Sequence, residues 1–189
     1  MVGYIMRKNF SLKEFLFGFV FSFIVRFLRV FPNNDPIMGC MLPQARKNAF
    51  QAAAFAFLAM LVFDFFTSGI GIWTYVTATT YALLALFFSF YFSKKKVHYS
   101  TYASASIVGV LIFDIITGPL MSSFLFNQSF LFTTLAQIPF TLSHLVSGVS
   151  YTLVLAPVFD LDVRKELLFK VHSIKNFLLF VSNFWRGFF

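Results

Sequence analysis

The chain has 189 residues and a formal net charge of +8, with 59% hydrophobic and only 12% charged residues. This balance excludes an ordinary soluble domain and identifies an integral membrane protein. The single cysteine, Cys40, excludes an intramolecular disulfide and a cysteine metal cluster. Nucleic-acid binding is not expected either, because basic residues of multi-pass membrane proteins gather in cytoplasmic segments and set the orientation.

The first apolar stretch, residues 12–31, is long enough to cross a hydrocarbon core of about 30 Å. It is expected to be an uncleaved first helix, since no small-x-small cleavage site follows the basic N-terminal segment. The sequence Pro-Asn-Asn-Asp-Pro at residues 32–36 then predicts a turn. Arg26 and Arg29 lie in the outer third of this helix, where an interfacial anchor and a pocket or ion-pair role are both open.

Three more helices are expected before residue 96. The apolar run at residues 37–45 is too short for a full crossing, which predicts a short second helix sheltered by protein. Residues 49–66 predict a third helix, whose alanines allow close packing within the bundle or against a partner. A turn at residues 67–71 leads to a fourth helix, residues 73–92, which ends at a run of lysines.

Residues 99–117 predict a fifth helix, which Gly118-Pro119 is expected to end. A polar-aromatic loop then reaches to residue 136, and residues 137–158 predict a sixth helix. The tail from residue 163 to residue 189 mixes apolar residues with scattered cations, a pattern typical of an amphipathic helix on the inner membrane surface.

These elements predict an all-α membrane protein with two parts. Residues 1–158 form a six-transmembrane-helix bundle with a short helix 2, and residues 159–189 form a basic, amphipathic, interfacial cytoplasmic tail. Placing the lysines at residues 94–96 in the cytoplasm puts every other basic cluster there as well, so six crossings satisfy the positive-inside rule. The expected location is the cell membrane, with both termini cytoplasmic.

One short sequence pattern occurs twice, at Leu61–Gly69 and at Leu111–Gly118, and each copy places an aspartate after an apolar run. An aspartate at the bilayer centre costs roughly 2.5–3.5 kcal/mol on insertion scales, so a repeated one needs a reason. At about 1.5 Å per residue, Asp64, Asp114 and His144 all lie roughly 24–27 Å from the charged residues at the inner ends of their helices, which are Lys47, Lys96 and Asp160. Three ionisable side chains are therefore expected at one level, around an outward-opening pocket.

This set is rich in hydrogen-bond acceptors and suits a small polar ligand with a ring and basic or donor groups. A bare metal ion fits less well, because the level holds one histidine and no cysteine, and no cofactor is expected. Structural roles remain open for single members, such as capping by Asp64 and Asp114 or an interfacial anchor for Trp73. The candidate substrate-binding residues are Asp35, Asp64, Trp73, Thr74, Thr77, Asp114, Gln137 and His144.

Enzyme activity is not expected. The Gly-x-Gly-Asp pattern of aspartyl intramembrane proteases is missing, and so is the Gly-x-Ser-Gly of rhomboid-type serine chemistry. No glycine-rich phosphate loop is present for ATP hydrolysis, so energy for transport must come from a partner or a gradient.

Four segments, residues 32–36, 71–77, 113–118 and 137–145, resemble the substrate-binding S components of energy-coupling factor transporters. The resemblance covers residues 12–158. It implies a vitamin or related micronutrient bound near the outer face, and as partners a transmembrane coupling subunit and a pair of ATPases. It also implies site roles for Asp35, Trp73, Thr74, Thr77, Asp114 and His144, with Asp64 in support.

The resemblance departs from the family at helix 1, where many members carry an alanine-x-x-x-alanine motif that meets the coupling subunit. Here only Gly18 and Ser22 have that spacing. An S component is the leading hypothesis. A stand-alone proton- or cation-coupled carrier is the first alternative, with Asp64, Asp114 and His144 as coupling groups. A structural membrane protein without a ligand is the second.

Overall fold

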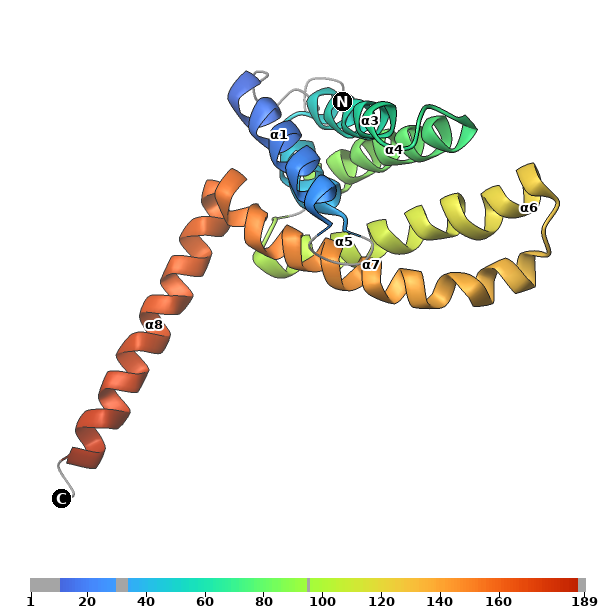
Figure 1. Cartoon of the computed structure of the whole chain (residues 1–189). Coiled ribbons are helices and arrows are strands. Elements are labelled where there is room, and N and C mark those ends of the chain that lie inside the picture. Colours follow the sequence, from blue (N-terminus) through green and yellow to red (C-terminus); the bar gives the residue numbers. More distant parts are fainter. Residues whose placement is uncertain (1–10, 30–33, 95, 187–189) are drawn as a thin grey trace.

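The computed structural model describes residues 11–29, 34–94 and 96–186, and within them every regular element is a helix, which confirms the all-α expectation. Figure 1 shows their arrangement. In chain order the elements are α1 (Leu12–Leu28), α2 (Pro36–Lys47), α3 (Ala49–Phe66), α4 (Ile72–Ser93), α5 (Tyr99–Ile115), the π-helix η2 (Ile116–Leu120), α6 (Met121–Phe126), α7 (Phe130–Phe159) and α8 (Leu161–Arg186).

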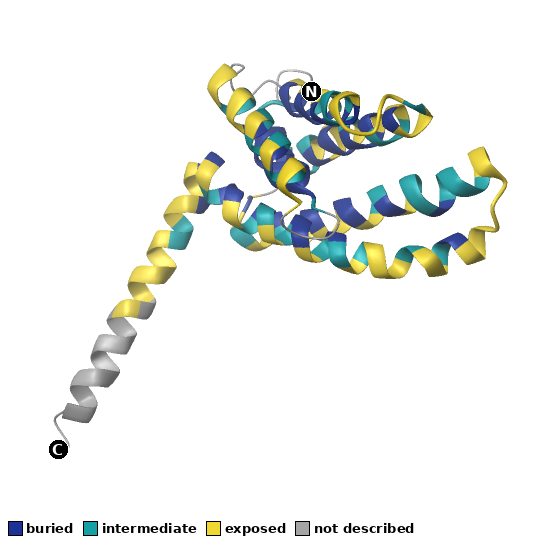
Figure 2. Cartoon of the chain, in the orientation of Figure 1, coloured by how far each residue is buried: buried dark blue, intermediate teal, exposed yellow. Residues whose placement is uncertain are grey.

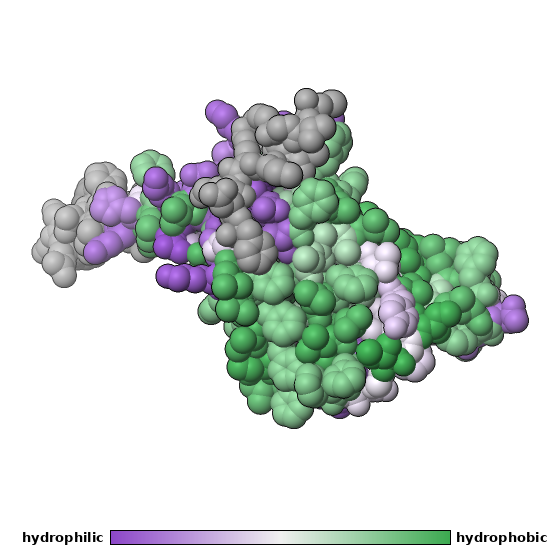
Figure 3. Space-filling view, turned by 90° about the horizontal axis from the view of Figure 1, so that it is seen from above, coloured by the Kyte–Doolittle hydropathy of each residue, from purple (hydrophilic) through white to green (hydrophobic). Residues whose placement is uncertain are grey.

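Among the described residues, four helical segments are long and apolar enough to cross a membrane: α3, α4, Tyr99–Phe126 and α7. Large apolar side chains face outward from them, and Leu83 and Val146 are 60% and 66% exposed. Figure 3 shows the apolar surface that results, with hydrophilic side chains gathered where α8 leaves the bundle. The chain is therefore a multi-pass helical membrane protein. At 17 and 12 residues, α1 and α2 are shorter than these four segments.

Helix α2 forms the centre of the bundle. Asp35 caps it by accepting hydrogen bonds from the N–H groups of Ile37 and Met38 at 3.0 and 3.3 Å. Pro36 occupies the first helical position, where its fixed φ suits a helix start. Every residue from 36 to 45 is buried. The prediction of a short, sheltered second helix is therefore confirmed.

Helix α1 runs parallel to α3 over most of its length. Near the start of both helices, the N–H of Ser11 donates to Oε1 of Gln51 at 2.9 Å. Near their other ends, a guanidinium nitrogen of Arg26 lies 2.8 Å from Sδ of Met60. Contacts between α1 and α3 thus extend from Gln51 to Phe66, whose ring meets that of Phe23. Helix α1 therefore covers nearly the same depth of the bundle as α3, which is long enough to cross a membrane.

Small residues bring α1, α2 and α3 close together. Gly18 and Ser22 form the buried face of α1, and a Cβ on Gly18 would lie 2.9 Å from Nε2 of Gln44. On α3, Ala52 and Ala56 are fully buried. Both small-residue faces are thus used inside the bundle, so Gly18 and Ser22 are not exposed for docking a partner subunit.

The prediction of a loop at residues 118–136 is wrong. The helix continues through η2 and α6 to Phe126, and α7 already begins at Phe130. Pro119 lies in the π-helical turn, a wide turn that accommodates a residue without an N–H. The 30 residues of α7 span about 45 Å, more than a hydrocarbon core of about 30 Å. In Figure 1 this hairpin extends past the turn between α3 and α4.

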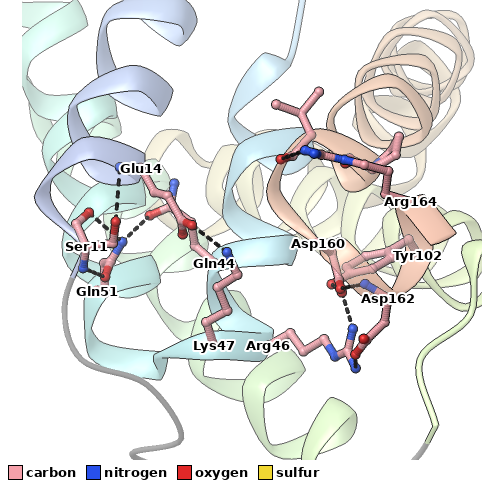
Figure 4. Close-up of polar contacts among 12 residues, drawn as sticks. Ser11, Glu14, Gln44, Arg46, Lys47, Gln51, Tyr102, Asp160, Asp162 and Arg164 are labelled. Carbon is pink, nitrogen blue, oxygen red and sulfur yellow. Dashed lines mark hydrogen bonds and ion pairs between the residues drawn. The ribbon is translucent and has the colours of Figure 1, made fainter.

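At the end of the bundle opposite the hairpin tip, polar contacts join α2 to α1, to α5 and to the junction between α7 and α8, and Figure 4 shows their members. Arg46 forms ion pairs with Asp160 and with Asp162, and Tyr102 donates to Asp160 at 2.9 Å. Lys47 pairs with Glu14 at 2.6 Å. We call this region the basic end, since Arg46 and Lys47 lie there.

The tail is helical, as expected, but it starts at Leu161 and leaves the basic end as one long helix, α8 (Figure 1). Glu166 on α8 accepts hydrogen bonds from Lys170 at 2.7 Å and from the N–H of Tyr99 at 3.2 Å. The bond from Lys170 lowers the pKa of Glu166. The contact of α8 with the inner membrane surface stays a prediction.

The approach of α2 to α7 gives a test of the fold. A Cβ on Gly39 would lie 2.8 Å from the carbonyl carbon of Tyr151. The substitution Gly39→Ala is therefore expected to lower the free energy of unfolding by about 2 kcal/mol, measured by denaturant unfolding in detergent. Ala54→Leu on the exposed side of α3 is the control, with a change within about 0.5 kcal/mol. Equal stability of the two variants would contradict the packing.

Candidate functional site

A cleft of about 810 Å³ opens at the end opposite the basic end, between α1, α3 and α4 on one side and α5, η2 and α7 on the other. Figure 2 shows buried residues where these helices meet and exposed residues toward the hairpin tip. Apolar side chains complete a largely polar lining. The polar residues that line the cleft are Arg26, Arg29, Asn34, Asp35, Tyr81, Asp114, Thr117, Gln137 and His144.

Three of these side chains form one hydrogen-bonded cluster, which we call the Asp–His–Asp cluster. Nδ1 of His144 lies 2.7 Å from Oδ1 of Asp114, and Nε2 lies 2.9 Å from Oδ2 of Asp35. All three residues are buried. An ionised carboxylate only accepts hydrogen bonds, so an imidazole that serves two of them must be protonated on both nitrogens. The geometry therefore suits an imidazolium between two carboxylates, which is a strong, charge-assisted arrangement.

The surroundings fix the cluster in position. Asp35 is already held as the cap of α2, and its N–H donates to Oγ of Ser147 at 3.3 Å. The ring of Phe113 meets the imidazole of His144 edge-on, with 5.6 Å between centroids, and Tyr81 stacks on Phe113. These contacts leave the imidazole little freedom to rotate away from its two carboxylates.

One acceptor of the cluster is unused. Oδ2 of Asp114 is buried and has no hydrogen-bond partner among the described residues. A buried carboxylate oxygen without a donor is costly, so it favours a ligand that supplies an N–H or an O–H. Asp114 lines the cleft, where such a ligand would lie.

Asp64 does not join this cluster. Its side chain accepts a hydrogen bond from Oγ1 of Thr74 at 2.7 Å, and its carbonyl accepts from the N–H groups of the next turn. Gly69 completes that turn with φ of +77°. The hydrogen bond between Asp64 and Thr74 thus holds the end of α3 against the start of α4. The two copies of the repeated pattern differ in role, since the second copy continues into η2.

Two further candidates also lie away from the cleft. Oγ1 of Thr77 donates to the carbonyls of Trp73 and Thr74 within α4, at 2.9 and 3.1 Å. The indole of Trp73 is 43% exposed and lies across Gly71. The structure therefore brings Asp35, Asp114, Gln137 and His144 to one cleft, whereas Asp64, Trp73, Thr74 and Thr77 do not line it.

The cleft also contains residues outside the candidate set. Tyr81 gave no signal in the sequence, because a tyrosine is not unusual in a membrane helix. Thr117 appeared only as the threonine three residues after Asp114 in the repeated pattern. Arg26 and Arg29 did give one, as charges inside an apolar helix, but their neighbours were not known. Both arginines line the cleft, so the pocket role left open for them agrees with their positions.

Comparison with known proteins identifies no relative, since no protein-family model, curated protein or solved structure matches the chain. The function of the cleft is therefore inferred from its residues and their geometry.

The Asp–His–Asp cluster predicts a large effect on stability. His144→Ala leaves two buried carboxylates without their shared donor, so the free energy of unfolding is expected to fall by about 3 kcal/mol in denaturant titrations. Combined with Asp114→Asn, the loss is expected to be smaller than the sum of the single losses by at least about 1 kcal/mol, because the two residues interact directly.

Thr74→Val is the matched control, since it removes the hydrogen bond to Asp64 and touches no member of the cluster. Its own cost is expected to be about 1–2 kcal/mol. With His144→Ala it should be additive within about 0.5 kcal/mol. Additive losses for Asp114 and His144, or strong coupling between Thr74 and His144, would contradict this assignment.

Proposed function

We propose that the chain is the membrane-embedded, substrate-binding component of an energised importer, and that it captures a small polar solute from the outer face. The observation that carries this proposal is the buried Asp–His–Asp cluster in the wall of an open cleft. Charged groups inside a membrane protein are costly and mark ligand or ion sites. A cleft of this size is suited to a small molecule.

The orientation follows from the distribution of charge. Arg46 and Lys47 end α2, Lys94 follows α4, and Lys96 precedes α5, all away from the cleft. The positive-inside rule places such residues in the cytoplasm. The cleft then opens to the outside. We infer six crossings, because α1 runs along α3 and α2 returns through the centre of the bundle. Both termini are cytoplasmic in this arrangement.

The resemblance to S components of energy-coupling factor transporters supports the same proposal. That family implies six helices with a short second helix, and a site formed by the first outer loop together with helices 4 to 6. The candidates on the outer loop and on helices 5 and 6 line the cleft, whereas Trp73, Thr74 and Thr77 on helix 4 do not. The proposed partners are a transmembrane coupling subunit and a pair of ATPases, and the proposed ligand is a vitamin or related micronutrient. Gly18 and Ser22 are buried, so the coupling subunit must meet other residues.

A second candidate function is a stand-alone carrier coupled to protons or cations. The observation that favours it is the position of His144, whose two ring nitrogens both face carboxylates. Such a group is suited to hold and release a proton. Uptake of the retained ligand by the purified chain in proteoliposomes, driven by a pH gradient alone, would favour this function over the first.

The orientation is tested by labelling single cysteines in intact cells. Cys40 is buried and is replaced by alanine, and Ser129→Cys at the hairpin tip and Lys96→Cys near the basic end are compared. A membrane-impermeant maleimide is expected to label Ser129→Cys directly. Lys96→Cys should react only after the membrane is opened. The reverse pattern would contradict the orientation.

The binding function is tested by mass spectrometry of small molecules retained after gentle purification. The wild-type chain is expected to retain one, and Asp114→Asn to retain it with at least about tenfold lower affinity, because a hydrogen bond to a charged acceptor is lost. Thr77→Val, whose hydroxyl bonds only within α4, is the control and should retain it like the wild type. Equal retention by all three chains, or none by any, would contradict the proposal.

A further inference from the structure

Every acidic side chain of this protein has a hydrogen-bond or ion-pair partner. The sequence holds seven, and the structure describes every one of them. None has an arginine of the cleft as a partner within 4.0 Å. Their partners are Lys47 for Glu14, His144 for Asp35 and Asp114, Thr74 for Asp64, Arg46 for Asp160 and Asp162, and His98 and Lys170 for Glu166.

Arg26 is the half-buried cation of the cleft. One of its terminal nitrogens lies 2.8 Å from Sδ of Met60, and its Cζ lies 4.1 Å from the ring centre of Phe63. A thioether is a weak acceptor and an aromatic ring carries no net charge. A guanidinium offers five N–H donors in a planar fork, so these two contacts leave most of its hydrogen-bonding capacity unused.

Arg29 adds a second cation to the same lining, and within the described residues it too has no ion pair. The two carboxylates of the cleft balance this charge only in part, although Asp35 interacts electrostatically with Arg26 from beyond ion-pair distance. Oδ1 of Asp35 caps α2 and its Oδ2 bonds His144, while Asp114 uses one oxygen for the same imidazole. With His144 protonated on both nitrogens, the cleft keeps an excess of positive charge on the side of α1.

We propose that the ligand of this cleft carries an acidic group, a carboxylate or a phosphate, which Arg26 binds with Arg29 beside it. The same ligand presents an N–H or O–H donor to Oδ2 of Asp114, the acceptor left unused on the other side of the cleft. The planar guanidinium fork matches the geometry of a carboxylate or phosphate. This proposal rests on the proposed binding function and specifies its substrate class.

The sequence alone predicts a ligand with a ring and basic or donor groups, and the ligand proposed above keeps the donor but not the basic group. Several carboxylates at one level suggest a basic ligand, since a cation is stabilised by a nearby carboxylate. The structure removes that reason, because His144 already neutralises part of the charge on both carboxylates. The charge left over in the cleft is positive, so an organic acid with a donor group fits better than an amine.

The test uses metabolites of yeast extract below about 1 kDa, separated by anion exchange at pH 8 into a retained acidic pool and an unretained pool. Each pool is added to the purified full-length chain in detergent, and the thermal midpoint is compared with that of the same chain alone. A ligand present at about 100 times its Kd is expected to raise the midpoint by about 5 °C. We expect this shift with the acidic pool only.

Variants of Arg26 test whether this residue binds the acidic group of the ligand. Arg26→Gln is expected to lose the shift or to need at least about tenfold more of the acidic pool, while Arg26→Lys should keep part of it because the charge remains. Lys170→Gln is the matched control, since it removes one positive charge on α8 away from the cleft, and it should respond like the wild type. A full response of Arg26→Gln would overturn the proposal.

The remaining outcomes separate this inference from the proposed function. A shift with the unretained pool alone would overturn the acidic ligand and leave the binding function standing. No shift with either pool would contradict the binding function itself. Treating the acidic pool with alkaline phosphatase distinguishes the two acids, because the shift disappears for a phosphate monoester and persists for a carboxylate.

Discussion

The two hydrogen bonds of His144 hold together three distant parts of the chain. They join the cap of α2, the last turn of α5 and the middle of α7, at 2.9 Å to Asp35 and 2.7 Å to Asp114. Removing any one partner leaves a charge in a buried position, which is much more costly than losing a surface contact. The same bonds therefore fix the helices and form the polar wall of the cleft.

The helices were largely predictable because apolar length and charge decide where a membrane helix starts and ends. The third helix has the expected bounds, Ala49–Phe66, and the fourth differs by one residue at each end. The expected loop at residues 118–136 failed for a physical reason. Gly-Pro usually ends a helix in water, but a membrane helix can absorb proline in a wider turn when neighbouring helices pack against it, as α7 does against η2.

Part of the cleft was predictable from distance along the helix axis. Counting about 1.5 Å per residue placed Asp114 and His144 at one level, and they are in contact. The same count placed Asp64 there too, yet its carboxylate meets Thr74. Height is only one coordinate, and the direction of a side chain around its helix depends on packing that the sequence does not state. Arg26 stands out only in the structure, where every carboxylate has a hydrogen-bond or ion-pair partner other than this arginine.

The polar contacts at the two ends of the bundle differ in what they leave unpaired. At the basic end, Arg46 is satisfied by Asp160 and Asp162, and Lys47 by Glu14. In the cleft, arginine donors and one carboxylate oxygen remain unused by the described residues. Charges that pair with each other stabilise a fold, whereas charges left available inside a membrane protein are suited to bind something else.

Solid-state NMR of the chain in lipid, with ¹⁵N-labelled histidine and ¹³C-labelled aspartate, tests the arrangement around His144 most directly. Replacing His98 and His172 by asparagine leaves His144 as the single labelled histidine. Dipolar contacts are predicted from both ring nitrogens to carboxyl carbons, Nδ1 to Asp114 and Nε2 to Asp35, each lost on replacing that aspartate by asparagine. A ring with a contact to neither carboxyl carbon, or to only one, would contradict the site described here.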